Sequence, residues 1–286
     1  MFYDEDMILD IRLNILDEYV SNFIICEASF NHNGTKRELK FNIDNFKKHK
    51  NKIIYIPLEN QPEGLRIIDE KDNQIIKNSK ILDNALIREN FQRNFLQKKI
   101  NQFDEDDLII ISDVDEIPNL KDFKYSSKIT LFEQKMFYYK FNLIHENFTW
   151  YGSKLCKKKH LISPQWLRNI KSKKYPLWRV DALFSNKKYQ SINFIKNGGW
   201  HFTNIKTPEK IDYKMKNFLH HLEYEESGLN VNDVKKIIEE KKVFYDHSAD
   251  KKEKKWSASV ELVRESDTAL PDYIIKNKEK FKDWLD

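Results

Sequence analysis

Three acidic residues follow one apolar run and precede a proline. Asp113, Asp115 and Glu116 come directly after the isoleucines of "IIISDVDEIPN". In an extended backbone, residues i and i+2 point the same way, so the Cα atoms of Asp113 and Asp115 are expected ~6 to 7 Å apart. Two carboxylates at that spacing can converge on one hard divalent cation, Mg²⁺ or Mn²⁺, whose other positions water and phosphate oxygens fill. The segment therefore favours a metal site that a nucleotide diphosphate completes.

A structural role is the alternative for these acids. Carboxylates after a strand often cap the next helix or remain solvated in a loop. Asp113 taken alone fits that role, and Glu116 is expected to be a cap rather than a ligand. The pair behind four apolar residues favours ligand binding.

The elements before the acids indicate an α/β fold. Apolar residues at helical spacing in 5–17 predict a helix, and "NFIICEAS" and "NKIIYIPLE" predict buried strands. A helix between Leu82 and Ile100 then leads into "DDLIIISDVDE". Strands that are apolar throughout and alternate with helices predict a mostly parallel sheet flanked by helices. Ligands of such sheets bind at the carboxyl ends of the strands, where the acids lie.

The second half differs in character. "LFEQKMFYYKFNLI" and "WRVDALF" predict longer, partly exposed strands, and Thr207 and Pro208 begin a helix that opens a helical C-terminal part. Because no repeat or long linker interrupts the chain, residues 1–286 are expected to form a single domain.

Composition narrows the class of protein only broadly. The 286 residues are 40% hydrophobic and 33% charged, which argues against a largely disordered chain. The net charge of +5 is compatible with anionic small molecules, a membrane surface or nucleic acid, and separates none of them. Cys26 and Cys156 are expected to be free thiols in a reducing compartment. No signal-peptide pattern or long apolar span is present, so a cytoplasmic location is expected.

Three segments carry a resemblance to a known family. "FYDEDMILDIRLNILDEYVSNFIICEASFNHNGTKRELKF", then "IIISDVDEIPN", then "GGWHFTNI" resemble, in order and spacing, glycosyltransferase family 17. The resemblance implies a GT-A fold of Rossmann-like type, a UDP-sugar donor, Mn²⁺ or Mg²⁺, and inversion at the anomeric carbon. It also implies a nucleotide-sugar half near residues 1–120, an acceptor half in 121–286, and N-acetylglucosamine as the sugar transferred to a glycan or glycolipid.

The metal site is assigned first to Asp115. Asp115, and secondarily Asp113, should hold the metal that bridges the donor phosphates. Asp113 is also a donor-binding candidate, through the ribose or a metal-bound water. His201 follows two glycines and could contact the metal or a phosphate from the other side of the cleft, although packing between Trp200 and Phe202 would explain it equally well.

Donor contacts are expected from two further residues. Glu27 ends a predicted strand in the matching "CEAS" block, and an exposed loop acid is its alternative. Arg88 presents a planar fork of donors suited to a diphosphate. Arg93 has the same chemistry, but Glu89 four residues earlier also explains it as a surface ion pair.

Inversion needs a base that takes the proton of the acceptor hydroxyl. Asp181 in "WRVDALF" is the expected base, with Glu133 and Glu146 as rivals.

Two other classes of protein remain open at this point. A metal-dependent phosphoryl or nucleotidyl enzyme would also use paired aspartates, but typically with a second acidic cluster that the sequence lacks. A non-catalytic glycan- or nucleic-acid-binding protein would need no metal at Asp115. The lysine runs "KLCKKKH" and "IKSKKYPLW" are expected to be ordinary surface, with contact to an acceptor or to anionic lipid on the cytoplasmic face as the second interpretation; nucleic acid is not expected.

Overall fold

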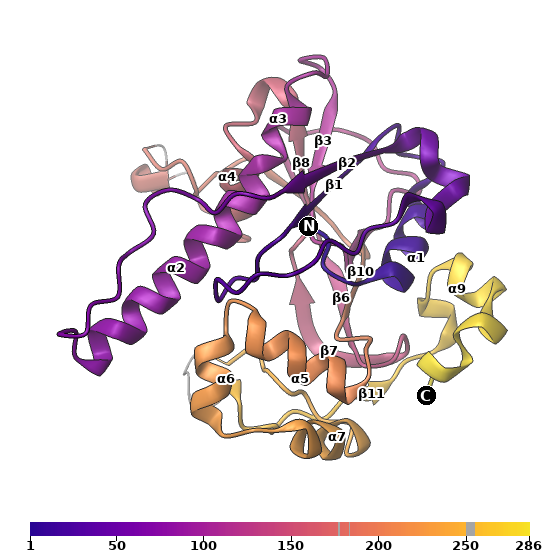
Figure 1. Cartoon of the computed structure of the whole chain (residues 1–286). Helices are drawn as coiled ribbons and strands as arrows, with labels where there is room; N and C mark the ends of the chain where they lie inside the picture. The colour runs from indigo at the N-terminus through magenta and orange to yellow at the C-terminus, as the bar shows by residue number, and fades with distance from the viewer. Residues whose placement is uncertain (177, 183, 250–254) are drawn as a thin grey trace.

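The computed structural model is a mixed α/β protein with three sheets and helices around them (Figure 1). It describes residues 1–176, 178–182, 184–249 and 255–286. The three sheets are, in spatial order, β1 (Phe23–Ala28) and β2 (Ile53–Leu58); β3 (Leu108–Ile111), β8 (Lys154–Lys157), β5 (Ile129–Phe132) and β9 (Ile192–Ile195); and β11 (Val263–Arg264), β7 (Leu143–Trp150), β6 (Gln134–Tyr138), β10 (Gly199–Thr203) and β4 (Glu116–Pro118).

The predicted α/β class is confirmed, whereas the prediction of a mostly parallel sheet is wrong. Among the strands described, β1 with β2, β6 with β10, and β5 with β9 pair in parallel. The other five pairs are antiparallel. An apolar run shows that a strand is buried but not which way it runs, and the short link between β6 and β7 allows a direct antiparallel return.

Helices surround the sheets, and two segments depart from the expected elements. In "WRVDALF", whose Leu183 lies outside the described residues, the described part contains the short 3₁₀ turn η3 (Val180–Ala182) and no strand. The helix after Thr207 ends at Asn217, and a second one follows. The α-helices are α1 (Asp6–Leu16), α2 (Gln74–Phe95), α3 (Gln97–Ile100), α4 (Pro164–Asn169), α5 (Pro208–Asn217), α6 (His221–Ser227), α7 (Val231–Glu239) and α9 (Asp272–Lys276); η1 (Ile43–Lys52), η2 (Lys158–His160), η4 (Asp267–Ala269) and η5 (Lys278–Trp284) are further 3₁₀ turns.

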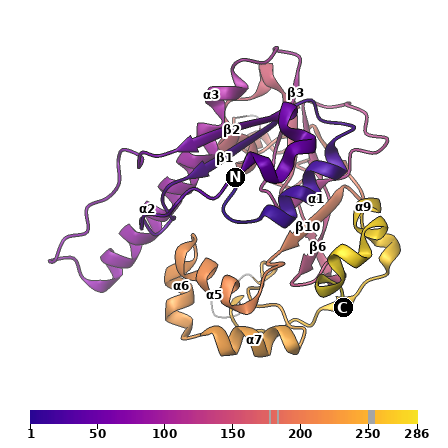
Figure 2. The same cartoon turned by 45° about the vertical axis from the view of Figure 1, so that its right-hand side comes forward.

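The two ends of the chain pack together. Helix α9 lies beside α1 in both views (Figure 2). The Tyr273 hydroxyl donates to Asp10 Oδ2 at 3.1 Å, and Lys280 Nζ donates to the same oxygen at 2.7 Å. Segments far apart in sequence thus form one side of the molecule.

The core consists of three apolar clusters. One joins α1 to β1 and to the C-terminal helices, one lies between α2, α3 and the β3–β8–β5–β9 sheet, and one lies beneath α5, α6 and α7. Cys26 and Cys156 are both free and buried in the second cluster, as the sequence predicted.

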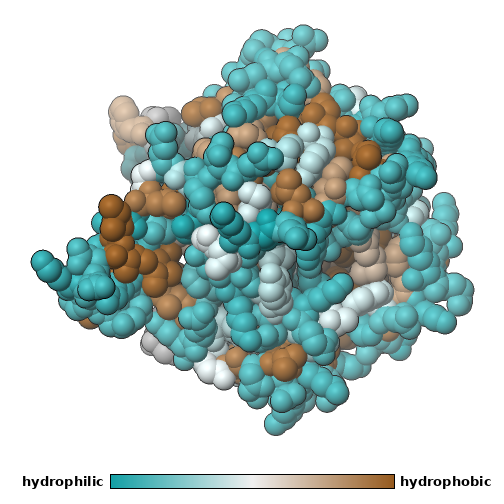
Figure 3. All heavy atoms as spheres, in the orientation of Figure 1, coloured by the Kyte–Doolittle hydropathy of each residue, from teal (hydrophilic) through white to brown (hydrophobic). Residues whose placement is uncertain are grey.

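The surface is largely hydrophilic in the view of Figure 3, with brown apolar patches between the charged side chains. Within the described ranges, no helix has the length and apolar character needed to cross a membrane.

Candidate functional site

The acidic segment lies where the chain passes from one sheet to another. Asp113 follows β3, and Glu116 begins β4 in the five-stranded sheet. The Asp113 N–H donates to Glu116 Oε2 at 2.8 Å, and the Glu116 N–H donates to the Asp113 carbonyl at 3.1 Å. These two bonds close a tight turn that displays Val114 and Asp115 at its apex.

Arg12 of α1 donates hydrogen bonds to the backbone of this turn. Its Nη1 donates to the carbonyls of Glu116 at 2.6 Å and Asp113 at 3.2 Å, and its Nη2 donates to Ser112 Oγ. Burial of the guanidinium lowers the pKa of Arg12 to about 10, although nearby Glu116 raises it. These contacts make Arg12 a positioning residue for the acidic turn.

Glu116 is the centre of a buried ion-pair network. It is 1% exposed, and Arg168 binds it with both nitrogens, Nη2 to Oε1 at 2.6 Å and Nη1 to Oε2 at 2.7 Å. Trp150 Nε1 also donates to Oε1 at 2.6 Å. A Cβ added to Gly152 would lie 2.0 Å from Glu116 Oε1, so only glycine leaves room for this contact.

Asp113 belongs to the same network. Arg168 Nη2 donates to its Oδ2 at 3.0 Å, and Arg93 Nη2 lies 3.3 Å from its Oδ1. Burial would raise the pKa of Asp113, but the two guanidiniums hold it well below its usual value. We call Asp113, Glu116, Arg93, Arg168 and Trp150 the arginine cluster. Its charges compensate one another, so Asp113 already has cationic partners.

Asp115 lies outside the arginine cluster and next to His201. In β10, His201 pairs with Glu116 of β4, and the neighbouring Phe202 N–H donates to the Asp115 carbonyl at 2.9 Å. This register brings His201 Nε2 to 3.6 Å from Asp115 Oδ2. Burial opposes ionisation of Asp115, but the neighbouring His201 ring lowers the pKa of this carboxyl group. In the described residues, Asp115 has no ion pair with arginine or lysine.

His201 is held by its surroundings. It is 5% exposed, and its ring stacks on Trp150 with centroids 4.9 Å apart. Its Nδ1 is buried and finds no hydrogen-bond partner among the described residues. Gly199, two residues earlier, has φ +127°, and a Cβ there would lie 2.1 Å from the Ile117 carbonyl. Gly199 thus permits the close approach of β10 to β4.

A cavity of about 260 Å³ opens over these residues. We call it the polar cavity. Asp113, Asp115, Glu116, Arg168 and His201 all line it, so the structure brings together the three residues expected at the metal. Nowhere in the described ranges do three or more His, Cys, Asp or Glu side chains form a metal-binding group. The protein therefore offers an oxygen and a nitrogen ligand rather than a closed metal cage. Aromatic and basic groups complete the wall, among them His32, Tyr138, Trp150, Lys214, Phe218, His220, Tyr245 and Trp256.

Glu27 lies elsewhere in the fold. It is fully buried and accepts four hydrogen bonds, from Arg37 Nη2 at 2.8 Å, the Lys40 N–H at 2.8 Å, the Phe41 N–H at 3.0 Å and the Tyr55 hydroxyl at 3.0 Å. It is neither the exposed acid of the alternative interpretation nor part of the polar-cavity wall. These contacts make it a fold-stabilising carboxylate in this structure.

Arg88 and Arg93 of α2 have different contacts. Arg88 donates through Nε to Gln61 Oε1 at 2.7 Å and through Nη1 to the His32 carbonyl at 3.1 Å, so it supports the wall without lining it. Arg93 is 3% exposed and reaches Asp113 as well as Glu89. The surface-pair interpretation of Arg93 is therefore wrong, because the arginine is buried.

None of the three expected base candidates lines the polar cavity in the described structure. Asp181 is exposed and paired with Arg179 at 2.6 Å and Lys188 at 2.8 Å, which lower its pKa. Glu146 is exposed on β7, and Glu133 lies between β5 and β6. The structure does not bring these acids to Asp115.

The first lysine run is mostly neutralised by neighbouring acids. Lys157 and Lys159 pair with Asp106 at 2.8 and 2.7 Å, and Lys158 pairs with Glu105 at 2.9 Å. Lys154 is the exception, since it is buried and donates to the carbonyls of Arg168 and Ile170. These contacts favour the ordinary-surface interpretation of the run.

Arg168 and Trp150 are functional residues that the sequence did not indicate. They lie 52 and 34 residues beyond Glu116 and reach it only through folding. Ser163, whose side chain accepts from the Trp166 N–H, and Pro164 announce a helix start at α4, but nothing in that signal points to Glu116.

The chain is similar to known glycosyltransferases. The sequence profile of Glycosyltransferase family 17 matches residues 1–286. The chain is 29% identical over 119 residues to the human and to the rat Beta-1,4-mannosyl-glycoprotein 4-beta-N-acetylglucosaminyltransferase. Each alignment covers 39% of this chain and 19% of the relative, so the match spans about a fifth of those proteins. No solved structure matches.

Proposed function

The chain belongs to glycosyltransferase family 17, and we propose that it transfers a sugar, N-acetylglucosamine, from a UDP-sugar to a hydroxyl group of a glycan or glycolipid. The observation that carries this proposal is the Asp115–His201 pair on the wall of the polar cavity. The names of the human and rat relatives support the choice of sugar.

The donor set fits a divalent cation. Two atoms that each lie ~2.1 Å from one ion can be at most ~4.2 Å apart, and Asp115 Oδ2 and His201 Nε2 are 3.6 Å apart. Carboxylate oxygen and imidazole nitrogen suit Mn²⁺, and the carboxylate also suits Mg²⁺. Asp115 and His201 would hold the metal, with Asp113 as a secondary ligand. When bound, the ion would neutralise the charge that develops on the leaving UDP.

The arginine cluster has a positioning role in this proposal. Arg12 fixes the backbone of the acidic turn, and Arg168 holds the Glu116 side chain. Asp115 therefore needs little rearrangement to bind a cation. Lys214 on the cavity wall could add a positive charge near the donor phosphates. Glu27 and Arg88 act further away, by maintaining the strand and the loop behind that wall.

The proposal also includes inversion at the anomeric carbon of the sugar and a GT-A-type arrangement of donor and acceptor sites. The acids at the end of β3 support a GT-A-type donor site, and the wall supplied by β10 and α5 to α6 supports an acceptor half beyond residue 120. Inversion requires a base in line with the departing UDP. Asp181, Glu133 and Glu146 are left out of the site because they do not line the polar cavity.

A metal-dependent phosphoryl or nucleotidyl enzyme is less well supported. Two-metal chemistry requires a second set of acidic ligands, and in the part of the chain described, no group of three or more metal-binding side chains occurs.

The test is sugar transfer itself. The protein is incubated with Mn²⁺, UDP-N-acetylglucosamine and a panel of glycan acceptors, and both UDP release and acceptor mass are followed. We expect Mn²⁺-dependent transfer that Asp115→Asn abolishes and Asp181→Asn retains. Transfer that is equal in wild type and Asp115→Asn would contradict the proposed site. If other nucleotide sugars react and UDP-N-acetylglucosamine does not, the choice of sugar is wrong.

A further inference from the structure

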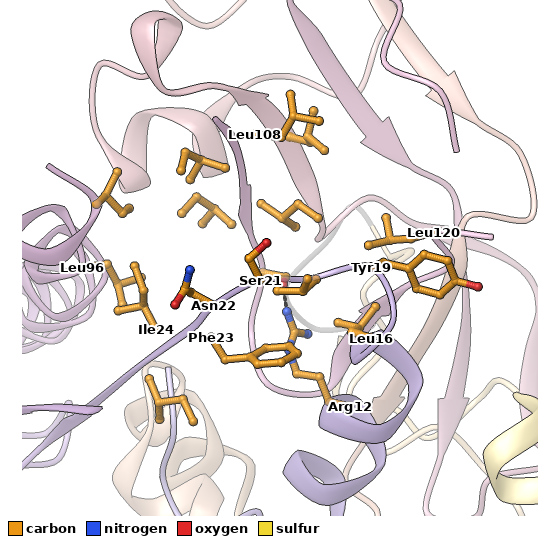
Figure 4. Close-up of a pocket in the computed structure, with 18 of the residues that line it drawn as sticks. Arg12, Leu16, Tyr19, Ser21, Asn22, Phe23, Ile24, Leu96, Leu108 and Leu120 are labelled. Atoms are coloured by element: carbon orange, nitrogen blue, oxygen red, sulfur yellow. Dashed lines mark hydrogen bonds between the residues drawn. The ribbon is translucent and has the colours of Figure 1, made fainter. Parts of the chain in front are cut away.

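The walls of two cavities differ in their chemistry. A cavity of about 350 Å³ between β1 and β3 is lined mainly by apolar side chains, among them Leu16, Ile24 and Leu108 (Figure 4). The wall of the polar cavity instead carries four histidines, which are His32, His201, His220 and His247. Imidazole is the side chain that most readily exchanges a proton near neutral pH. Groups suited to proton transfer thus gather in the polar cavity.

His220 is oriented by a carboxylate. It directly precedes α6, and Glu223 lies three residues further on, so the two side chains meet on one face of the helix. His220 Nδ1 is 3.6 Å from Glu223 Oε1, and Trp256 Nε1 donates to Oε2 of the same carboxylate at 3.2 Å. The Tyr245 ring packs on the imidazole with centroids 4.9 Å apart. A carboxylate beside Nδ1 favours the tautomer that carries its proton there, which leaves the lone pair of Nε2 for a substrate.

The His220 imidazole is neutral near pH 7. Its partial burial lowers the pKa of the ring below the ordinary value of ~6.5, although Glu223 acts in the opposite direction. The side chain is still 39% exposed, so a proton that it accepts can return to solvent. The titratable and charged groups around it are Glu223 of α6, Glu89 of α2, and Tyr245, His247 and Lys255 of the segment after α7.

The other carboxylates of the cavity wall are less suited to accept a proton. Outside the acidic turn, Glu5 and Glu89 line the polar cavity. Lys206 Nζ lies 3.2 Å from Glu5 Oε1, and Arg93 Nη2 donates to Glu89 Oε1 at 2.9 Å. A neighbouring cation stabilises the charged carboxylate and weakens it as a proton acceptor. His220 has an anionic partner instead, which strengthens it as an acceptor.

Aromatic rings connect His220 to the proposed metal ligand. His201 belongs to β10, whereas His220 links α5 to α6. Trp150 stacks on His201 with centroids 4.9 Å apart. His247 contacts Trp150 at 5.2 Å and Tyr245 at 4.8 Å between ring centroids. Because aromatic faces pack against the apolar face of a sugar, this row of rings offers an acceptor sugar a surface between His201 and His220.

We propose that His220 is the general base of the sugar transfer and that Glu223 is its positioning residue, an inference that rests on the proposed function. The oxygen of the acceptor hydroxyl forms a bond to C1 of N-acetylglucosamine while the bond between C1 and the diphosphate oxygen breaks, and the electron pair of that bond leaves with UDP. The hydroxyl proton moves to Nε2 of His220. Glu223 stabilises the resulting imidazolium, which then returns the proton to solvent.

The test separates the chemical step from donor binding. Transfer to the best acceptor of the glycan panel is measured between about pH 5 and 9 with saturating Mn²⁺ and UDP-N-acetylglucosamine. The variants are His220→Gln, Glu223→Gln and, as the matched control, His160→Gln, since His160 of η2 does not line the polar cavity in the described structure. Calorimetric donor binding with Mn²⁺ and thermal unfolding are recorded for each protein.

The largest loss of turnover is expected at His220. His220→Gln should lower kcat about 100-fold or more, while Tm and Mn²⁺-dependent donor binding keep their wild-type values. Glu223→Gln should lower kcat about tenfold or more and move the acid limb of the pH profile to lower pH, because Glu223 raises the pKa of His220. His160→Gln should behave like wild type in all three measurements. If His220→Gln does not fold, the shift of the acid limb in Glu223→Gln decides alone.

Three results would overturn the inference, and they differ from one another. A wild-type kcat for His220→Gln, with the acid limb unmoved in Glu223→Gln, would remove His220 from the mechanism and leave the proposed function intact. Loss of donor binding together with kcat would make His220 a donor contact rather than the base. Absence of transfer by the wild type from any nucleotide sugar would end the proposed function and this inference together.

Discussion

Asp113 and Asp115 lie two residues apart in one turn, yet their surroundings differ sharply. Asp113 belongs to the arginine cluster, where two guanidiniums compensate its charge. Asp115, which lines the polar cavity as Asp113 does, has His201 at 3.6 Å as its ion-pair partner among the described residues. A pair of acids that looks symmetrical in sequence is therefore divided by folding into a carboxylate that holds the turn and one that remains available to a ligand.

The largest effect is expected where the arginine cluster is broken. Arg168→Met leaves Glu116, which is 1% exposed, without its bidentate partner. Loss of one partner of a buried ion pair costs about 3–5 kcal/mol. Urea unfolding should show a loss of this size. Arg179→Met, which removes an exposed arginine from an aspartate, is the matched control and should unfold like wild type. A wild-type midpoint for Arg168→Met would contradict the assigned role of the cluster.

Asp115→Asn should lower metal affinity without lowering stability, which is the opposite of the effect expected at Arg168. Since the residue has no arginine or lysine ion pair in the described structure, its replacement should leave the urea midpoint nearly unchanged while Mn²⁺ affinity in the presence of UDP falls about 100-fold or more. Manganese binding can be followed by electron paramagnetic resonance. The comparison variant is Asp113→Asn, whose main effect should be a loss of stability rather than of metal affinity. If Asp113→Asn and Asp115→Asn lose affinity equally and neither is destabilised, the division between the two acids is wrong.

Gly152→Ala tests the packing of the cluster. The added methyl group would lie 2.0 Å from Glu116 Oε1 and 2.3 Å from Trp150 Nε1. Overpacking of a buried site costs about 1–3 kcal/mol, so thermal and urea unfolding should both show a loss in that range. Gly64→Ala is a useful control, because nothing lies within 4 Å of its added methyl group and only its positive φ opposes the change.

Lys154 predicts a dependence of stability on pH. Burial, with Arg168 nearby, lowers the pKa of Lys154 to about 7, against ~10.4 in an unfolded chain. Between those values the unfolded state binds more protons, so stability should rise with pH from about 7 to about 10, by at most ~1.4 kcal/mol per pH unit. Lys154→Met should remove this rise in urea unfolding measured across the window. An unchanged slope would show that Lys154 is charged in the folded protein.

The smallest effect is expected at Asp181. The residue is exposed and lies outside the polar cavity, so Asp181→Asn should retain wild-type stability and transfer. Complete loss of transfer with donor binding intact would restore Asp181 as the base and would require its loop to close over the acceptor.

Local signals predicted part of this arrangement. The apolar run before Asp113 predicted the strand that leads to the acids, β3, although only Ile109 and Ile111 of it are buried. The glycine pair before Trp200 predicted a close backbone approach, which Gly199 makes to β4. The directions of the strands and the contacts of the arginine cluster could not be predicted from the sequence. Trp150 and Arg168 meet Glu116 only because β7, α4 and β4 converge, and no short spacing encodes that contact. Glu27 lies in its predicted strand, one residue before the end, but four donors contributed by other segments fix its role.

We propose above that Asp115 and His201 hold the metal of the donor site. The decisive measurement is calorimetric titration of UDP-N-acetylglucosamine into wild type and Asp115→Asn, each with and without Mn²⁺. Binding is expected only to the wild type and only with Mn²⁺. Binding of equal strength to both proteins without Mn²⁺ would contradict it.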